Sequence, residues 1–530
     1  MESTCFLDEL ISCSADRTPT RIALISGESS LDYATLAEAV AAFAAGVGQM
    51  DIGRQERIGI YLEKRNETVI ASFGAAAAGA VFVPLNPLLK PEQVGYILRD
   101  CNVRMLVTSP ERLTLLGDVL KQCRDLRHVV VTSGNMVASE QTMLNGITTT
   151  TWSDLLATPP CPGHRVIDTD MAAILYTSGS TGQPKGVVLS HRNMVAGAKS
   201  VAGYLDNNAD DTLLAALPLS FDAGFSQLTT AFHVGARVVL INYLLPRDVL
   251  NAVVKERVTG LTAVPPLWIQ MSQLDWPETV TDHLRYIANT GGRMPLDTLK
   301  VLRGHLPRTR PFLMYGLTEA FRSTYLPPEE VERRPDSIGK AIPNAEILVL
   351  RDDGTPCAPN EPGELVHRGA MVGMGYWNDP EKTAERYKAL PGRESGLVLP
   401  EIAVFSGDTV RMDEEGFLYF IGRRDEMIKS SGYRISPTEI EEVLYGSQLV
   451  GEAAAFGVPH PTLGQAVVVV ATPKPDRDVD AETLLAACRV RLPAYMQPAR
   501  IDIRPGPLPR NPNGKIDRKS LSLQFEVAFT

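Results

Sequence analysis

The chain has 530 residues and a net charge of −10; 44 % of its residues are apolar and 22 % are charged. This length predicts more than one domain, and the composition is that of an ordinary globular protein. The negative charge argues against nucleic acid and anionic membrane surfaces as general partners.

The apolar runs, the N-terminal segment and the cysteines indicate the cellular compartment to expect. No apolar run approaches the ~20 residues that a membrane-spanning helix needs. The segment Met1–Glu9 carries acids and no basic stretch, so we do not expect a signal peptide. The seven cysteines form no CxxC pair and are odd in number, as is typical of reduced thiols. We therefore expect a cytoplasmic protein without integral membrane association.

The first two thirds of the chain alternate between strand-like and helix-like runs. From Arg21 to about Thr132, strands at Arg57–Tyr61 and Val81–Pro84 flank a helix at Val69–Ala80. Strands that alternate with helices predict parallel sheets of βαβ type. A second such region extends from Val166 to Tyr325, with strands near Asp211–Leu217, Arg237–Ile241, Gly260–Ala263 and Tyr286–Asn289.

The last third changes character. From Ile338 to Asp408, short β-runs with Gly and Pro turns predict a distorted β-barrel or an antiparallel sheet. Further on, Ser436 as N-cap, Pro437 in the first turn and Glu439 in a capping box predict the start of a helix. The fold class expected is α/β: a large N-terminal domain (1–424) of two βαβ-type subdomains plus a distorted β-barrel, and a small mobile α+β C-terminal domain (425–530).

One segment carries more chemical information than any other of its length: Tyr176-Thr177-Ser178-Gly179-Ser180-Thr181-Gly182-Gln183-Pro184-Lys185-Gly186. It follows a strand-like run, and it offers backbone N–H groups, small hydroxyls and a lysine. Such a loop is suited to polyphosphate. A P-loop NTPase needs Ser or Thr directly after its Gly-Lys pair, and here Gly186 follows Lys185, so that reading fails on spacing.

This loop opens an ordered series of motifs. Ser220-Phe221-Asp222, Thr290-Gly291-Gly292 and Tyr315-Gly316-Leu317-Thr318-Glu319 come first, followed by Ser406-Gly407-Asp408, Gly422-Arg423-Arg424-Asp425, Gly432-Tyr433 and Asn513-Gly514-Lys515. In order and approximate spacing the series resembles the adenylate-forming superfamily of acyl-CoA synthetases, peptide-synthetase adenylation domains and luciferases. The resemblance implies activation of a carboxylic acid by ATP and Mg²⁺, with release of pyrophosphate.

The resemblance also implies roles for the residues that match the motifs. Thr177, Ser178, Thr181 and Lys185 would hold the β- and γ-phosphates, Tyr315 would stack on adenine, and Asp408 and Arg423 would bind the ribose. Glu319 would be the magnesium ligand, with Thr318 at the α-phosphate. Gly179, Ser180, Gly182 and Gly316 complete the expected ATP-binding set.

Two further residues would belong to the small domain and its motion. Lys515 matches the catalytic lysine that bridges carboxylate and α-phosphate oxygens. Asp425 resembles the hinge about which the small domain rotates between adenylation and thiol attack. In the second state, Gly432 and Tyr433 would line the pantetheine channel.

The acid pocket is expected to contain Asp222, Asn289, Gly291, Met314 and Arg322. Phe221-Asp222 resembles the Phe-Asp of amino-acid-activating domains, whose aspartate pairs with the substrate ammonium. A buried carboxylate needs a partner, and Arg322 is a second candidate for that partner. Amino-acid recognition is slightly favoured over a pair internal to the protein.

We expect a free-standing ligase that delivers its acyl group to a separate thiol, since no carrier-domain motif follows Lys515. The acceptor would be the pantetheine of an acyl or peptidyl carrier protein, and coenzyme A is the alternative, with a fatty or aryl acid as substrate.

Overall fold

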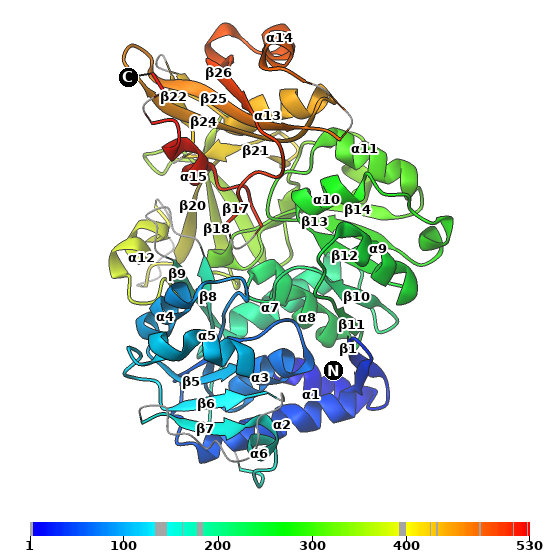
Figure 1. Cartoon of the computed structure of the whole chain (residues 1–530), viewed down its shortest axis with the longest axis vertical. Helices are drawn as coiled ribbons and strands as arrows, with labels where there is room; N and C mark the ends of the chain where they lie inside the picture. Colours follow the sequence, from blue (N-terminus) through cyan, green and yellow to red (C-terminus); the bar gives the residue numbers. More distant parts are fainter. Residues whose placement is uncertain are drawn as a thin grey trace.

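The computed structural model describes residues 4–132, 146–161, 163–177, 184–391, 399–424, 426–430, 433–475, 477, 479–511, 514–526 and 528–529. Within these ranges the strands form four sheets, and the one built from β22 (Ile428–Ser430) to β26 (Arg500–Ile503) belongs to the C-terminal part of the chain. In Figure 1 that part lies at one end of the molecule, and the first sheet with its helices lies at the other. The expected α/β class, with a large domain and a small one, is confirmed.

The first sheet runs in the order β7-β6-β5-β3-β4-β8-β9. Its strands are parallel except for the antiparallel pair β8–β9, which places Thr177 opposite Lys185. The predicted phosphate loop connects these two strands, and its residues 178–183 lie outside the described ranges. The strands are β3 (Arg57–Tyr61), β4 (Val81–Pro84), β5 (Val103–Thr108), β6 (His128–Val131), β7 (Thr148–Thr151), β8 (Met171–Thr177) and β9 (Lys185–Ser190).

The helices of the N-terminal third are α1 (Glu9–Arg17), α2 (Tyr33–Gln49), α3 (Asn66–Ala77), α4 (Pro91–Asp100), α5 (Pro110–Leu120) and α6 (Trp152–Leu156). The strands predicted at Arg57–Tyr61 and Val81–Pro84 have the bounds expected, and the helix between them begins and ends three residues earlier than predicted. Its alanines and Gly74 allow close packing, since an added Cβ on Gly74 would lie 2.6 Å from Phe43.

The second sheet runs in the order β16-β15-β14-β13-β12-β10-β11-β1-β2 and is parallel from β14 to β1. Ligand sites in such sheets form at the carboxyl ends of the strands. Its strands are β1 (Ile22–Ser26), β2 (Ser29–Asp32), β10 (Thr212–Ala215), β11 (Arg237–Leu240), β12 (Gly260–Ala263), β13 (Tyr286–Asn289), β14 (Arg310–Tyr315), β15 (Thr324–Leu326) and β16 (Lys340–Ala341). Its helices are α7 (His191–Tyr204), α8 (Asp222–Val234), α9 (Pro246–Lys255), α10 (Pro265–Met271) and α11 (Leu296–His305).

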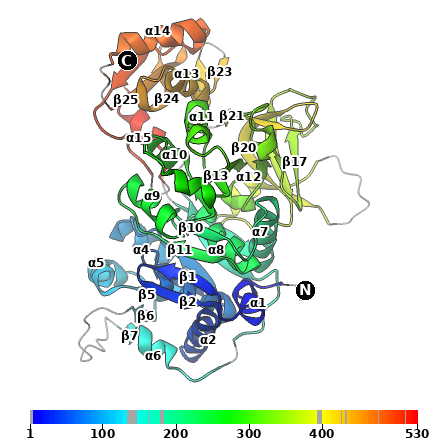
Figure 2. The same cartoon turned by 90° about the vertical axis from the view of Figure 1, so that its right-hand side faces the viewer.

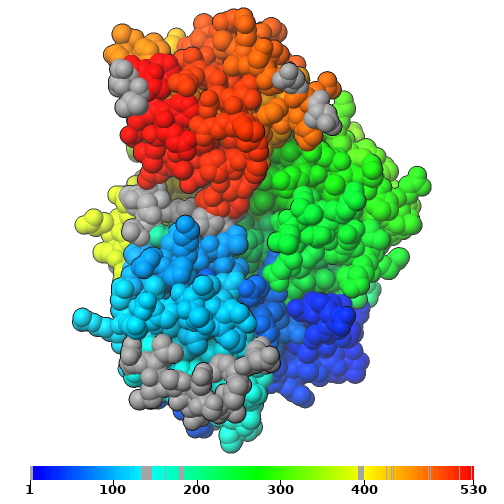
Figure 3. All heavy atoms as spheres, viewed as in Figure 1, coloured from blue at the N-terminus to red at the C-terminus, as the bar shows by residue number. Residues whose placement is uncertain are grey.

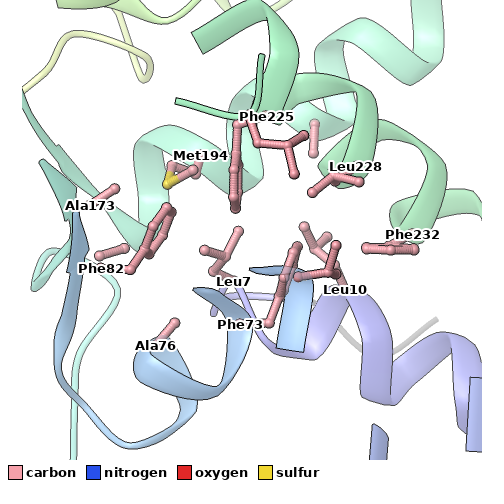
Figure 4. Close-up of a cluster of buried hydrophobic side chains, with 14 of the residues drawn as sticks. Leu7, Leu10, Phe73, Ala76, Phe82, Ala173, Met194, Phe225, Leu228 and Phe232 are labelled. Carbon is pink, nitrogen blue, oxygen red and sulfur yellow. The ribbon is translucent and has the colours of Figure 1, made fainter. Parts of the chain in front are cut away.

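The main hydrophobic core joins the two sheets. Figure 4 shows Phe73 of α3, Phe82 of β4 and Phe225 of α8 facing one another, with Leu7 and Phe232 beside them. Phe225 stacks on Phe82 with ring centroids 4.8 Å apart and on Phe73 at 5.6 Å. Aromatic pairs of this kind contribute about 0.5–1.5 kcal/mol beyond their burial. The packing therefore fixes α8, the helix that begins at Asp222.

The third sheet is antiparallel and runs β17-β18-β20-β19, with β21 paired to β20. It corresponds to the predicted barrel region, and in Figure 2 it projects to one side of the molecule. The β20–β21 register places Asp408 opposite Arg423. Its elements are β17 (Ala345–Leu350), β18 (Gly363–Gly369), α12 (Pro380–Arg386), β19 (Tyr387–Ala389), β20 (Ile402–Met412) and β21 (Leu418–Arg423).

The C-terminal sheet runs β23-β22-β25-β24, with β26 paired to β25. Its elements are β22 (Ile428–Ser430), β23 (Tyr433–Ile435), α13 (Pro437–Gly446), β24 (Val450–His460), β25 (Gly464–Pro473), α14 (Ala481–Arg491), β26 (Arg500–Ile503) and α15 (Arg518–Leu523). Ser436 is the N-cap of α13, but the predicted capping box is wrong because its hydroxyl makes no cap bond. The hydroxyl donates instead to the carbonyl of Ile421 in β21.

Polar contacts tie this C-terminal part to the large domain, over whose end it lies in Figure 3. Arg293 Nε lies 3.2 Å from a carboxylate oxygen of Glu442 in α13, and Gln448 Nε2 donates to Asp297 in α11 at 2.5 Å. The hinge predicted at Asp425 falls on a residue outside the described ranges. Among the described helices, none combines the length and apolar character that crossing a bilayer requires.

Candidate active site

Asp408 is the centre of the predicted ribose site. Tyr315, the last residue of β14, donates its hydroxyl to Asp408 Oδ2 at 2.5 Å, and Arg423 Nε lies 3.5 Å from Oδ1. Among the described residues Oδ1 has no hydrogen-bond partner, although it is buried. Burial raises the pKa of the Asp408 carboxyl, and Arg423 and the Tyr315 hydrogen bond oppose that rise. A buried carboxylate oxygen that lacks a donor fits a hydroxyl-bearing ligand such as ribose.

Arg386, a cation that the sequence motifs did not indicate, packs against Gly407, the neighbour of Asp408. Gly407 has φ +72°, and an added Cβ there would lie 1.9 Å from Arg386 Nη1. Arg386 ends α12 and donates to the carbonyl of Phe405 at 3.2 Å. Glycine is therefore required at 407 both for its backbone conformation and for the position of this guanidinium. Nothing in the sequence near Arg386 signals this contact, which depends on the pairing of β19 with β20.

Glu319, the predicted magnesium ligand, lies in a short 3₁₀ turn with Thr318 (Thr318–Ala320). Tyr376 donates its hydroxyl to Glu319 Oε1 at 2.6 Å, an orienting contact that the sequence did not reveal. No hydrogen bond to Oε2 is found among the described residues, so this oxygen suits a hard cation that also binds phosphate oxygens. Lys185 Nζ lies 5.5 Å from the Tyr376 ring centroid, and burial lowers the pKa of this lysine.

Lys515 approaches Gly291 of the large domain from the C-terminal part of the chain. Its Cε lies 3.7 Å from the position of an added Cβ on Gly291. Burial and the Arg423 cation lower the pKa of Lys515, while Asp222 and Asp408 act in the opposite direction. Lys515 is nevertheless an exposed residue.

Asp222 and Arg322 form a buried ion pair, so the alternative partner for Asp222 is the one observed. Arg322 Nη1 lies 3.3 Å from Asp222 Oδ2, and each side chain is 4 % exposed. Burial raises the pKa of the Asp222 carboxyl, which the Arg322 and Lys515 cations oppose. A substrate ammonium would have to share Asp222 with this guanidinium.

The other predicted pocket residues fall into two groups. Met314 and Arg322 line a narrow cavity of about 20 Å³. Asn289 and Gly291 lie at the carboxyl end of β13, where Asn289 Nδ2 donates to the Gly292 carbonyl at 2.8 Å and Gly291 has φ +75°. The predicted phosphate-loop residues Ser178, Gly179, Ser180, Thr181 and Gly182 lie outside the described ranges.

Family models match both parts of the chain: AMP-binding enzyme over residues 12–377 and AMP-binding enzyme C-terminal domain over residues 439–515. The chain is 31 % identical to a feruloyl-CoA synthase of Amycolatopsis sp, over 96 % of this chain and 97 % of that protein. It is 28 % identical to a long-chain-fatty-acid–CoA ligase of Salmonella typhimurium, over 97 % and 94 %. It is also 28 % identical to a linear gramicidin synthase of Brevibacillus parabrevis, over 97 % of this chain and 6 % of that protein.

Among solved structures, the o-succinylbenzoate coenzyme A synthetase of Bacillus subtilis in complex with ATP and magnesium ion is similar to this chain. Its TM-score is 0.81 at 27 % identity, with 97 % of this chain and 99 % of that chain covered. The family assignment accounts for the order of the motifs. The chain belongs to the AMP-binding enzyme family, and it is an adenylate-forming ligase that uses ATP and Mg²⁺.

Proposed function

We propose that the protein joins a carboxylic acid to the thiol of coenzyme A through an acyl-adenylate. A carboxylate oxygen of the acid attacks the α-phosphorus of ATP, and pyrophosphate leaves. The thiol sulfur then attacks the acyl carbon, AMP leaves, and the thiol proton is released. The observation that supports this best is the position of Lys515: it belongs to the C-terminal part of the chain, yet its Cε lies 3.7 Å from the place of an added Cβ on Gly291, at the carboxyl end of β13.

Each half of the cleft has a role in this scheme. Asp408 and Arg423 bind the ribose, and Thr177 and Lys185 bind the phosphates that leave. Glu319, with Thr318 beside it, would hold the Mg²⁺, which would supply positive charge to the phosphates. Lys515 bridges the acid carboxylate and the α-phosphate while negative charge builds up between them, a task of positioning and electrostatic stabilisation.

Coenzyme A is proposed as acceptor because the relatives that match this chain along nearly their whole length are CoA ligases by name. The test has two assays. ATP–pyrophosphate exchange with a panel of acids reports adenylate formation, and AMP release on addition of coenzyme A reports transfer. Exchange without any transfer to coenzyme A would exclude this acceptor, and no exchange with any acid would exclude the ligase reaction for that panel.

A second candidate is activation of an amino acid for a carrier protein. The similarity to a linear gramicidin synthase favours it, and so does Asp222 in the acid pocket. The Asp222–Arg322 pair weighs against it, since a carboxylate already paired with a guanidinium attracts an ammonium less strongly. Exchange with amino acids but not with their deaminated analogues would support this candidate over the first.

A further inference from the structure

A small cavity beside Arg322 is lined by both apolar and polar residues. It lies among α7, α8, β10, β12, β13 and β14 and is lined by Val201, Leu205, Leu213, Leu214, Ala223, Ser226, Gln227, Thr230, Gly260, Thr262, Tyr286, Met314 and Arg322. Its volume is about 20 Å³. A water molecule needs a cavity of roughly 10–15 Å³. The cavity therefore accommodates a group about the size of a hydroxyl, and a long alkyl tail would not fit.

Three residues that line this cavity have a polar atom without a partner in the described part of the chain. Among the described residues, Gln227 Oε1, Thr230 Oγ1 and Arg322 Nε are buried and make no hydrogen bond. The exposed fractions of these residues are 6 %, 2 % and 3 %. Leaving a buried polar group unpaired costs about 1–3 kcal/mol, so their gathering at one cavity points to a ligand group.

The three atoms differ in what they require. Gln227 Nε2 donates to the Gly224 carbonyl at 3.1 Å, which identifies Oε1 as the remaining acceptor. Arg322 Nε carries a proton and requires an acceptor, and the Thr230 hydroxyl can act in either role. A hydroxyl group both donates and accepts, so one hydroxyl can satisfy Gln227 and Arg322 together.

Charged groups fit the same wall less well. A carboxylate has no proton for Gln227 Oε1, and it would place a second negative charge beside Asp222, which already pairs with Arg322. An ammonium would face the Arg322 guanidinium at close range. Burying either charge in so small a cavity carries a large desolvation cost.

Arg322 connects this cavity to the predicted acid pocket, because it lines the cavity and pairs with Asp222 at the start of α8. We infer that the acid activated by this enzyme carries a hydroxyl group away from its carboxylate, and that Gln227, Thr230 and Arg322 bind this hydroxyl. The inference rests on the proposed function and names the substrate class of that same site: short aliphatic or aromatic hydroxy acids.

The experiment is ATP–pyrophosphate exchange with matched acid pairs that differ by one hydroxyl. The pairs are ω-hydroxyalkanoates of four to six carbons against the corresponding alkanoates, and hydroxybenzoates and hydroxycinnamates against benzoate and cinnamate. For at least one pair we expect kcat/KM to favour the hydroxy acid by about 10- to 100-fold, the range expected for pairing buried polar groups.

Variants assign the preference to the cavity. Gln227→Leu and Thr230→Val should lower the preference to within about threefold while keeping exchange with the unsubstituted acid. Thr229→Val is the matched control, since the Thr229 hydroxyl donates to the Ser226 carbonyl at 3.3 Å and Thr229 does not line the cavity. It should keep the wild-type preference.

The inference is overturned if the wild-type enzyme favours the hydroxy acid in none of the pairs. It is also overturned if both cavity variants keep the wild-type preference. Exchange with unsubstituted acids would in either case leave the proposed ligase reaction standing, whereas no exchange with any acid would remove the proposed function and this inference together.

Discussion

The nucleotide half and the acid half of the cleft use buried carboxylates in opposite ways. Asp408 accepts a hydrogen bond from Tyr315 at one oxygen, while its other oxygen has no hydrogen-bond donor among the described residues. Asp222 has its charge balanced within the protein by Arg322. The first arrangement presents an acceptor to a ligand, and the second stabilises the protein itself. Removing the Asp408 carboxylate should therefore weaken ATP binding, whereas removing the Asp222 carboxylate should lower the stability of the protein.

The largest effect is expected from Asp222→Asn. It leaves the Arg322 guanidinium buried without a counter-charge, so the free energy of unfolding should fall by about 3–5 kcal/mol. Urea denaturation measures this change. The double variant Asp222→Asn/Arg322→Met removes both charges and should regain most of the lost stability. A single variant as stable as the wild type would show that the acid half does not depend on this pair.

The next effect is expected from Lys515→Ala, which tests the group that lies between the two halves. Adenylate formation should fall by about 10²–10³-fold, as when one preorganised donor is removed from an active site. Thiol transfer from a supplied adenylate should stay near the wild-type rate. The control is Lys519→Ala, an exposed lysine four residues further on. Equal losses in both steps would contradict a role confined to adenylation.

The pH dependence of adenylation should follow the same lysine. Burial and Arg423 lower the pKa of Lys515 below the ordinary lysine value of 10.5. The charged form is lost as pH rises through that lowered pKa, so the exchange rate should decline on the alkaline side before pH 10.5. Lys515→Arg keeps a cation at higher pH and should move the decline upward. An unchanged profile in that variant would assign the titration to another group.

A smaller effect is expected from Asp408→Asn, which tests the nucleotide half. It removes a charge that accepts hydrogen bonds worth about 1.5–3 kcal/mol, so the KM for ATP should rise by about 10- to 100-fold. Thermal unfolding should stay close to that of the wild type. Asp352→Asn, which changes an exposed partner of Arg424, serves as control. A large loss of stability in Asp408→Asn would show that Asp408, like Asp222, mainly stabilises the protein.

The smallest effect is expected from Glu442→Gln at the contact between the domains. The Arg293 and Glu442 side chains are 24 % and 25 % exposed, and pairs with this much solvent contribute at most about 1 kcal/mol. Adenylate formation should slow by no more than about fivefold, and thiol transfer should not slow. Glu332→Gln, the control, removes a more exposed pair with Arg303 inside the large domain. If both variants slow adenylation equally, the domain contact has no specific role.

The residues predicted for the nucleotide half lie in short sequence motifs. Gly407 and Asp408, for example, are neighbours within β20, where Gly407 has φ +72°. Their partners were harder to foresee, because Tyr315 and Asp408 meet across 93 positions of sequence. The acid cavity depends on which face of α8 points toward β13 and β14, and neither the composition nor the spacing of that helix indicates this.

The N-terminus of α13 shows where local rules fail. Ser436, Pro437 and Glu439 correctly predicted where the helix starts, but the capping box did not form. The Ser436 hydroxyl bonds to Ile421, fifteen residues earlier and on the other side of the predicted hinge. A contact between domains replaces the local one, and a pattern of neighbouring residues does not reveal such an exchange.

Lys515 lies among groups of the large domain although it belongs to the C-terminal part of the chain. If the small domain rotates as the sequence predicts, ligand affinity and domain orientation are linked. Whatever free energy Lys515 then contributes to binding an anion beside it, the anion contributes equally to the orientation that brings Lys515 there. The change in charge as pyrophosphate leaves and the adenylate forms would then shift the populations of the domain orientations.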